Sequence, residues 1–253
     1  MGKLKVGKHI NYILISMMLW TNFSCMYIEK REKDTVSDPE PEIIIKKRDD
    51  GTLSSVNQVD DMGYVHGIRT TYYPDGKTIY SRLTVNHGIK QGPAIWYYNN
   101  GQVFKHASFD QGKMHGPTRK YHRSGKLLAE VDYENGNVLP GLREYDKDGT
   151  LVTSYPEVTF REINYLETKN RIDLEISSSE KLSGIKYFLV EEDNGNTSRV
   201  YLITESGKAS LQYFVKPGDM LNKKIEIVAE IPTYFGNIMA KRLTYQLTAT
   251  NLR

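Results

Sequence analysis

The sequence predicts an all-β protein in which a tandem array of β-hairpins precedes a two-sheet sandwich. Glycine-containing motifs recur every 24 or 25 residues in the first part of the chain, which is typical of repeat architectures. Alternating apolar and polar residues then fill residues 156–253, as expected of half-buried strands. Tyrosine is abundant, with 18 residues against 2 tryptophans, and this balance also favours strands over helical bundles.

The first 24 residues have the pattern of a signal peptide. Lys3, Lys5 and Lys8 precede an apolar run over residues 10–20, which is shorter than the roughly 20 residues of a membrane-spanning helix. Cys25, the only cysteine, follows this run directly. The arrangement resembles a bacterial lipoprotein signal and implies that Cys25 becomes the acylated N-terminus. An uncleaved anchor or an ordinary secretory signal remains an alternative interpretation.

Residues 25–50 are expected to form a flexible charged tether behind the acylated cysteine. Residues 26–42 are rich in charge, contain two prolines and show no apolar period, so they cannot offset the entropy of ordering. Acyl chains anchor such a tether in a membrane. We therefore expect a protein of the cell envelope, held at the outer membrane of a Gram-negative bacterium. A single cysteine also excludes a disulfide framework and cysteine-based zinc sites.

The charge balance argues against nucleic acid as a partner. The formal net charge is +3, and the first 24 residues contain three lysines and no acidic residue. Removal of this segment leaves a neutral chain, which has no overall attraction for a phosphate backbone.

Two glycine marks define the repeats between residues 51 and 154. The first mark is a Gly-x-x-x-Gly motif, loosened by one residue in the fourth unit, and the second is a glycine preceded by Asp, Asn or Ser. Asp-Gly and Asn-Gly between extended segments favour hairpin turns, because both central turn residues need positive φ. Each unit is thus predicted to be a strand, a tight turn, a second strand and a connection. The structural positions are Gly67, Gly92, Gly116 and Gly141, then Gly76, Gly101, Gly125 and Gly149, and the tyrosines Tyr72, Tyr97, Tyr121 and Tyr145.

These glycines and tyrosines resemble the MORN repeat, specifically its bacterial variant, over residues 51–152. The resemblance implies an extended β-ribbon that serves as a scaffold or interaction surface. In other members of the repeat class it implies contact with membranes or lipids, and some bacterial-variant proteins are described as antitoxins. The fourth unit carries Pro140 and is expected to be a terminal unit.

After residue 155 the repeat period ends and about seven short strands are predicted. Ile172, Leu174 and Ile176 alternate with polar residues, and Gly-containing turns separate several similar segments. This pattern is typical of an immunoglobulin-like β-sandwich over residues 156–253. Two roles are open for it. It caps the edge of the repeat sheet, which would otherwise favour aggregation, or its loops, including residues 233–237, form a binding face.

The sequence contains no motif that predicts catalysis, a cofactor or a metal site. Nucleophile elbows, P-loops and dinucleotide-binding glycine motifs are absent. His66 and His115 share one repeat position, which Gln91 and Pro140 occupy in the other units, so this is interpreted as a variable turn position. We therefore expect a protein that is not an enzyme and that holds neither a cofactor nor a metal ion.

The tyrosines suggest either a packed ladder or an aromatic binding groove. Neighbouring residues of a strand point to opposite faces, so Tyr73 and Tyr98 should point away from Tyr72 and Tyr97 and meet solvent or a partner. The candidate binding face comprises Tyr73, Trp96, Tyr98, Arg69, Lys120 and Arg143.

Together these observations predict a membrane-anchored lipoprotein that acts as a non-catalytic protein-interaction or scaffold module. Its partner is expected to be another envelope protein. A different class of function, an antitoxin or immunity protein that binds a toxin, remains open, as does binding of glycans or lipid headgroups by the aromatic face.

Overall fold

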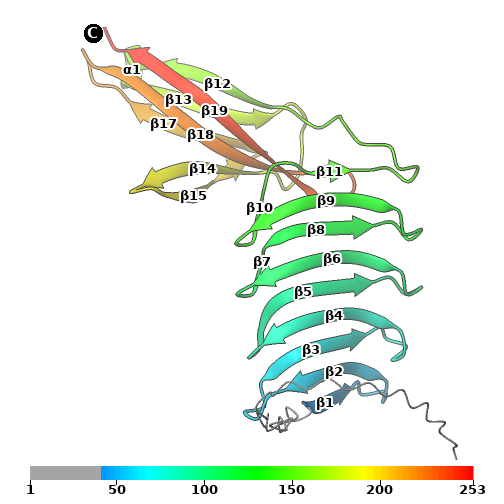
Figure 1. The fold of residues 1–253 in the computed structure, drawn as a ribbon. Coiled ribbons are helices and arrows are strands. Elements are labelled where there is room, and N and C mark those ends of the chain that lie inside the picture. The colour runs from blue at the N-terminus through cyan, green and yellow to red at the C-terminus, as the bar shows by residue number, and fades with distance from the viewer. Residues whose placement is uncertain (1–40, 253) are drawn as a thin grey trace, which may run out of the picture. The chain divides into compact units, whose positions relative to one another are not determined.

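The computed structural model describes residues 41–252, which form an all-β fold as predicted (Figure 1). The expected signal peptide, the lipidated Cys25 and most of the tether lie outside the described residues. The only helix between residues 41 and 252 is the single turn α1 (Leu166–Lys169). No helix in this part of the chain has the length and apolar character needed to span a membrane.

The repeats form one eleven-stranded antiparallel sheet in which most strands are neighbours in chain order. The main path is β1-β2-β3-β4-β5-β6-β8-β9-β10, while β7 pairs with β6 and β11 pairs with β9. This meander is the expected consequence of hairpins linked by short turns. The strands are β1 (Glu42–Lys47), β2 (Leu53–Val59), β3 (Val65–Tyr72), β4 (Ile79–Asn86), β5 (Ile89–Tyr97), β6 (Val103–Asp110), β7 (Lys113–Met114), β8 (Gly116–Tyr121), β9 (Leu127–Glu134), β10 (Asn137–Val138) and β11 (Arg143–Glu144).

The sheet starts earlier than the sequence predicted. Residues 42–47, assigned to the flexible tether, form β1 and pair antiparallel with β2. Three consecutive isoleucines explain the difference, because β-branched residues favour strands and the charged neighbours hid this short segment. The tether prediction is therefore wrong for these residues.

The two glycine marks specify two different turns. At the second mark only the glycine has positive φ, as at Gly101 (83°), and Gly101 N donates to Tyr98 O at 2.9 Å. Tyr98 N also donates to Gln102 O at 2.8 Å, so Tyr98 opposes both Gly101 and Gln102 and the glycine forms a bulge. A register shift between Trp96 and Tyr97 follows in the same hairpin. At the first mark both central residues have positive φ, as in His87 (46°) and Gly88 (81°). The prediction of two positive φ angles at Asp-Gly was thus wrong. The two-residue turns lie instead at Gly88, Gly112 and Gly136, whereas at Gly63 only the glycine has positive φ and Gly63 N donates to Asp60 O.

The repeat sheet has two unlike faces. Directly opposed residues of neighbouring strands lie on the same face of the sheet. We call one face the inner face, and it carries the buried small side chains Ser55, Ser81, Ala94, Ala107, Thr118 and Ala129. The alternate positions define an outer face, which carries the row Thr70, Arg82, Ile95, His106, Arg119, Glu130 and Arg143. Small residues on the inner face leave room for a few large side chains beside them.

The C-terminal residues form two four-stranded antiparallel sheets around one hydrophobic core. Leu174 and Ile176 of the first sheet and Ile227 and Leu247 of the second are fully buried in that core. The first sheet is β12 (Val158–Tyr165), β13 (Arg171–Ser178), β17 (Lys208–Phe214) and β16 (Thr204–Glu205). The second is β15 (Asn196–Leu202), β14 (Lys186–Asp193), β18 (Met220–Pro232) and β19 (Ile238–Thr250).

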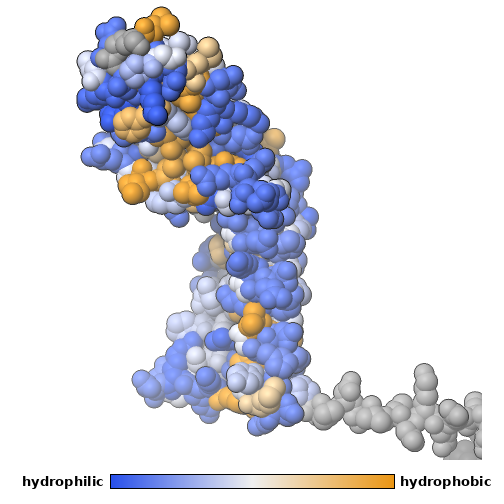
Figure 2. Space-filling view, turned by 90° about the vertical axis from the view of Figure 1, so that its left-hand side faces the viewer, coloured by the Kyte–Doolittle hydropathy of each residue, from blue (hydrophilic) through white to orange (hydrophobic). Residues whose placement is uncertain are grey.

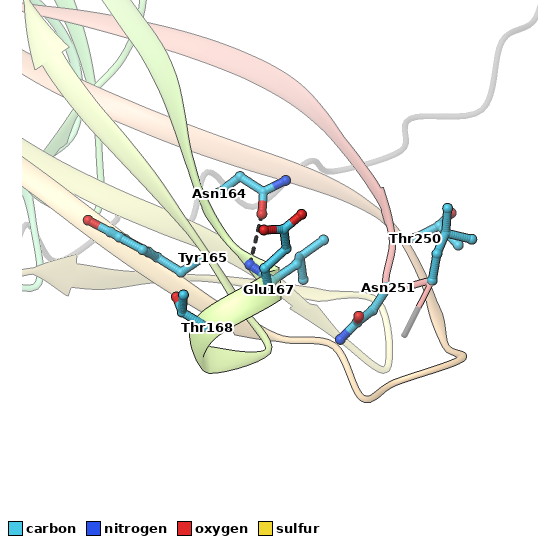
Figure 3. Close-up of a pocket in the computed structure, with 8 residues that line it drawn as sticks. Asn164, Tyr165, Glu167, Thr168, Thr250 and Asn251 are labelled. Carbon is cyan, nitrogen blue, oxygen red and sulfur yellow. Dashed lines mark hydrogen bonds between the residues drawn. The ribbon is translucent and has the colours of Figure 1, made fainter.

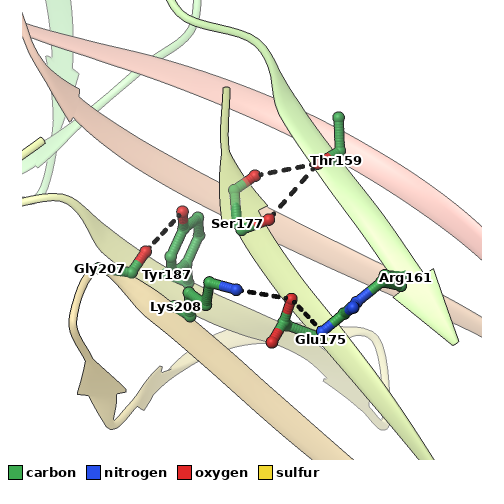
Figure 4. Close-up of polar contacts among 7 residues, drawn as sticks. All are labelled: Thr159, Arg161, Glu175, Ser177, Tyr187, Gly207 and Lys208. Atoms are coloured by element: carbon green, nitrogen blue, oxygen red, sulfur yellow. Dashed lines mark hydrogen bonds and ion pairs between the residues drawn. The ribbon is translucent and has the colours of Figure 1, made fainter. Parts of the chain in front are cut away.

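Polar contacts join the strands of the first of these sheets (Figure 4). The Glu175 carboxylate lies 3.2 Å from Arg161 Nη2 and 3.1 Å from Lys208 Nζ, and these contacts bridge β12, β13 and β17. Such exposed ion pairs contribute little each, so the apolar core carries most of the stability. From the second sheet, the Tyr187 hydroxyl donates to Gly207 O at 3.2 Å.

Candidate binding site on the inner face of the repeat sheet

Three neighbouring strands place large cationic and aromatic side chains in one row on the inner face. Trp96 of β5 is directly opposite Lys105 of β6, and Lys105 is directly opposite Lys120 of β8. Two residues along the same strands and on the same face, Ala94 and Ala107 are almost completely buried. Strand register thus brings together side chains that are 9 and 15 residues apart in the sequence.

Lys105 is a half-buried cation without an acidic partner. Its Nζ lies 5.0 Å from the centre of the Trp96 ring and 3.5 Å from Met114 Sδ, which is a weak acceptor. No carboxylate of residues 41–252 forms an ion pair with it. Burial lowers the pKa of Lys105, and the positive charges of Lys120 and Lys90 lower it further.

Two further lysines extend this positive charge. Lys90 Nζ lies 5.0 Å over the Phe109 ring, whose centre is 6.2 Å from that of Trp96. Lys120 Nζ donates to Gly236 O at 3.2 Å, and burial lowers the pKa of Lys120 while Glu144 raises it. We call Lys90, Lys105 and Lys120 the lysine row.

The lysine row has the properties of an anion-binding site. Partial burial of an ammonium group without a counter-ion is unfavourable, and neighbouring cations increase the cost. A carboxylate placed beside Lys105 would offset the cost of burying this ammonium and the repulsion from the neighbouring lysines. The Trp96 and Phe109 rings supply apolar contact next to that carboxylate. Figure 2 shows the repeats from the side of their strand ends, where the surface is mostly hydrophilic with small separate apolar patches.

The six residues predicted to form the binding face do not share one surface. Arg69, Trp96 and Lys120 lie on the inner face. Arg143 lies on the outer face, where it and Arg119 pair with Glu130 and lower the pKa of that carboxyl.

Tyr73 and Tyr98 were predicted to be exposed, and this was wrong. Both are half-buried, and each hydroxyl donates to a backbone carbonyl of the next unit: Tyr73 to Tyr97 O at 2.7 Å and Tyr98 to Tyr121 O at 2.8 Å. The same position in the flanking units holds Arg48 and His122, whose side chains contact Tyr72 O and Tyr145 O. We call these four contacts the turn ladder. The simple alternation of faces fails here because each of these residues directly follows the end of a strand and begins a turn.

Sequence reasoning missed Lys90 and Lys105. For Lys105 a signal was available, because residues 96 and 105 flank the turn that ends at Gly101 and therefore had to be close across the hairpin. The absence of a counter-ion could not be read from the sequence, since it depends on which acidic residues other strands bring near.

A second hollow lies at the end of the C-terminal sheets, beside α1 (Figure 3). It has a volume of about 470 Å³ and is lined by residues 164–168 and 250–252. Asn164 Oδ1 accepts from Leu166 N at 2.8 Å at its edge. Glu167 is the only acidic residue in the lining, which contains neither histidine nor cysteine, so nothing in this hollow favours a nucleophile and base in contact.

Three units of the ribbon have a counterpart among known families. Residues 65–86, 90–111 and 114–135 each match the family model described as the MORN repeat variant. These three segments are similar to the MORN repeat variant, and we call them the MORN repeats. Each match starts at or near the first strand of a unit and ends at or near the two-residue turn, so the family unit coincides with the structural one. No curated protein matches the chain.

The flanking hairpins continue the array without matching the family model. The β1–β2 hairpin keeps the same turn, with Gly51 N donating to Arg48 O. After the third MORN repeat, the fourth unit has only the short strands β10 and β11 and a bridge between Tyr145 and Leu151. The fourth unit was predicted to be the last of the array, and its short strands agree with this prediction.

Proposed function

We propose that the protein is a non-catalytic interaction module whose MORN repeats bind an acidic segment of a partner protein along the lysine row. The observation that carries this proposal is Lys105, a half-buried ammonium that no carboxylate of the described chain neutralises. An acidic segment would place carboxylates beside this charge and lay its apolar groups on Trp96 and Phe109.

A flexible segment is the form of partner that this face favours. Lys105 and Lys120 are directly opposed on β6 and β8, about 4.8 Å apart, and Lys90 lies on β5, six residues before the Trp96 that is opposite Lys105. A chain that crosses these strands meets several cations in succession. The match of residues 65–135 to a repeat family supports an extended contact surface over a single small-molecule pocket.

The proposed location of the protein is the cell envelope, where Cys25 is the acylated residue. Its support is the lysine-rich start of the chain, the apolar run and the position of the only cysteine. Labelling of growing cells with an alkyne fatty acid tests this, with Cys25→Ser as the control. Two outcomes would contradict acylation at Cys25. Either Cys25→Ser still carries the fatty-acid label, or the parent protein carries no label and is found in the soluble fraction.

We further propose that the two C-terminal sheets have an immunoglobulin-like topology. If the eight strands are lettered A, B, C, C′, D, E, F and G in chain order, the two sheets read A-B-E-D and C′-C-F-G. The first order is that of the immunoglobulin sheet ABED, and the second contains C-F-G.

Trp96 provides a direct readout of binding at the lysine row. The only other tryptophan is Trp20, so a full-length Trp20→Phe chain reports from Trp96 alone. Addition of a ten-residue glutamate peptide should change the Trp96 emission in a saturable way that weakens as salt is raised. A ten-residue lysine peptide should leave the emission unchanged.

Lys105→Met keeps the apolar stem and removes the charge. We expect about tenfold weaker binding of the glutamate peptide, since a charge-assisted contact contributes about 1.5–3 kcal/mol. Lys223→Met is the matched control, because Lys223 also lies over an aromatic ring, that of Tyr213, but in the C-terminal sheets. Equal affinity of the two variants, or no binding by the parent, would refute the proposed site.

A further inference from the structure

Three side chains of the types that bind metal ions meet at one edge of the first MORN repeat. Asp60 directly follows β2, His66 lies in β3, and His87 lies in the two-residue turn between β4 and β5. One ligand atom from each of these side chains can be chosen so that all three lie within 4.8 Å of one another. Three separate segments thus converge, although residues 60 and 87 are far apart in the sequence.

Asp60 presents one carboxylate oxygen that the fold leaves without a hydrogen bond. Its Oδ1 accepts from Met62 N at 3.1 Å and from Tyr64 N at 2.9 Å, which fixes the turn after β2. Its Oδ2 is buried, has no hydrogen-bond donor and lies 3.5 Å from His87 Nε2. The Asp60 side chain is 12% exposed, so solvent contributes little to this oxygen. An acceptor held in this way favours a cation.

The two histidines are spaced as ligands of one ion. His66 Nδ1 and His87 Nδ1 are 3.3 Å apart, and the two rings are nearly perpendicular. Two nitrogens bound to a tetrahedral zinc ion at about 2.0–2.1 Å lie about 3.4 Å from each other. His87 therefore faces a possible co-ligand on each side, with Nδ1 toward His66 and Nε2 toward Asp60.

We propose that Asp60, His66 and His87 form a zinc-type metal site that joins β2, β3 and the β4–β5 turn. Two imidazoles and a carboxylate are ligands that Zn²⁺ prefers. Rotation of an imidazole ring about χ2 selects which nitrogen binds, and this torsion is soft. The His87 side chain is 52% exposed, which leaves a fourth position to water.

Asn86 supplies an orienting contact for the same ring. Its Oδ1 lies 2.7 Å from His87 Nδ1. When His87 binds the ion through Nε2, an Nδ1–H donated to Asn86 fixes the ring, as second-shell acceptors do in zinc sites. When it binds through Nδ1, the ion replaces this hydrogen bond.

In the next repeat, the position of His66 is occupied by a glutamine, which hydrogen-bonds across the strands. Gln91 occupies the place of His66, and its side chain accepts from Gln111 N at 2.8 Å and donates to Asp110 at 2.9 Å. The first two repeats therefore share this cross-strand contact, and only in the first are both positions imidazoles. His115 holds the His66 position in the third repeat, where no such three-ligand group forms among the described residues.

Cobalt substitution tests the proposal on the full-length chain. Cys25→Ser serves as the parent, because the lone thiol also binds zinc and cobalt. We expect one Co²⁺ per chain, with the visible absorption of four-coordinate cobalt, and displacement by Zn²⁺. His66→Ala and His87→Ala should each weaken binding about tenfold or more, since even outer-shell changes weaken metal sites 10–100-fold.

His115→Ala is the matched control, because it removes an exposed histidine from the same repeat position. It should bind cobalt as the parent does. Asp60→Asn preserves an acceptor at Oδ1 for the turn but removes the charge, and it should weaken binding without a loss of folded β-structure by circular dichroism. Equal binding by the parent and by His66→Ala, or only the pale absorption of hexaaquo cobalt, would overturn the site.

Discussion

The Asn237 side-chain amide donates to Glu144 Oε1 at 2.5 Å and so links residues 93 positions apart in the chain. Thr233 Oγ1 donates to the same oxygen at 2.6 Å, and the Tyr155 hydroxyl donates to Oε2 at 3.2 Å. Glu144 belongs to β11, the last strand of the repeat sheet, and is 1% exposed. The turn between β18 and β19, one of the loops considered for a binding face from the sequence, supplies two of the donors to this buried carboxylate.

Replacement of Glu144 should destabilise both halves of the chain. Glu144→Ala leaves three donors without their acceptor, and each unsatisfied buried polar group costs about 1–3 kcal/mol. We expect a loss of about 3 kcal/mol or more in the free energy of unfolding, measured with denaturant. Hydrogen exchange should increase in β9 and in the β18–β19 turn together.

The control for this prediction is Glu157→Ala. Glu157 is well exposed and forms an ion pair with Lys241, so its loss should change stability by no more than about 1 kcal/mol. Faster exchange confined to one side of the Glu144 contact would show that this carboxylate does not couple the repeats to the C-terminal sheets.

The turn ladder predicts that single hydroxyl groups stabilise the repeats. Tyr98→Phe removes the donor to Tyr121 O and preserves the ring, which contacts Phe104 and Arg123. The expected cost is about 1 kcal/mol, the usual value of a net hydrogen bond. Thermal unfolding followed by circular dichroism provides the measurement.

Tyr80→Phe is matched to this change, because Tyr80 also lies in a repeat, packs edge-on against a neighbouring tyrosine and is exposed. Its hydroxyl makes no hydrogen bond within residues 41–252, so its loss should leave the melting temperature nearly unchanged. If Tyr98→Phe and Tyr80→Phe melt alike, the ladder contributes nothing measurable.

The sequence predicted the all-β class, the repeats and their period because glycine marks are local signals. Gly76 and Gly101 have positive φ for reasons that a few neighbouring residues determine. The β1 strand was missed because three isoleucines were too short a segment to outweigh the charges beside them. The two turn types were confused because the dipeptide signal does not show which residues oppose each other across the strands.

The candidate sites were harder to predict because they depend on register. Trp96 and Lys120 were identified as contact residues, but Lys105, which lies between them in the same row, was not. His66 was interpreted as a variable turn residue, because the 3.3 Å approach of His87 comes from another hairpin. A contact between residues of two different hairpins cannot be inferred from the residues that neighbour each of them in the sequence.

The lysine row predicts unusual titration of two side chains. Burial holds the pKa of Lys105 and that of Lys120 below the ordinary value, so both should lose their protons at lower pH than surface lysines do. Reductive ¹³C-methylation followed by NMR across alkaline pH measures this, with Lys105→Met and Lys120→Met to assign the two signals. Addition of the glutamate peptide should raise the pKa of Lys105, because a nearby carboxylate favours the charged form. A Lys105 signal that moves with the bulk of the lysines would contradict the burial of this ammonium.

Buried tyrosines predict a loss of stability at alkaline pH. Burial raises the pKa of Tyr187 to about 12 from an ordinary value of 10.0, and burial with the Glu144 charge raises the pKa of Tyr155 to about 12 as well. A raised folded-state pKa favours the protonated hydroxyl in the fold. This contribution is complete below pH 10 and is lost as pH rises from 10 to 12, where only the unfolded chain releases the proton.

Tyr187→Phe separates this effect from the general titration of lysines. At pH 7 the variant should be about 1 kcal/mol less stable, because it loses the hydrogen bond to Gly207 O. Between pH 10 and 12 the parent should lose on the order of 2 kcal/mol more than the variant, so the two stability curves approach and cross. Tyr234→Phe, at a ring that is 96% exposed, should follow the slope of the parent. If Tyr187→Phe keeps the parent's slope instead, the hydroxyl of Tyr187 ionises as readily in the folded chain as in the unfolded one, and its burial does not hold the proton.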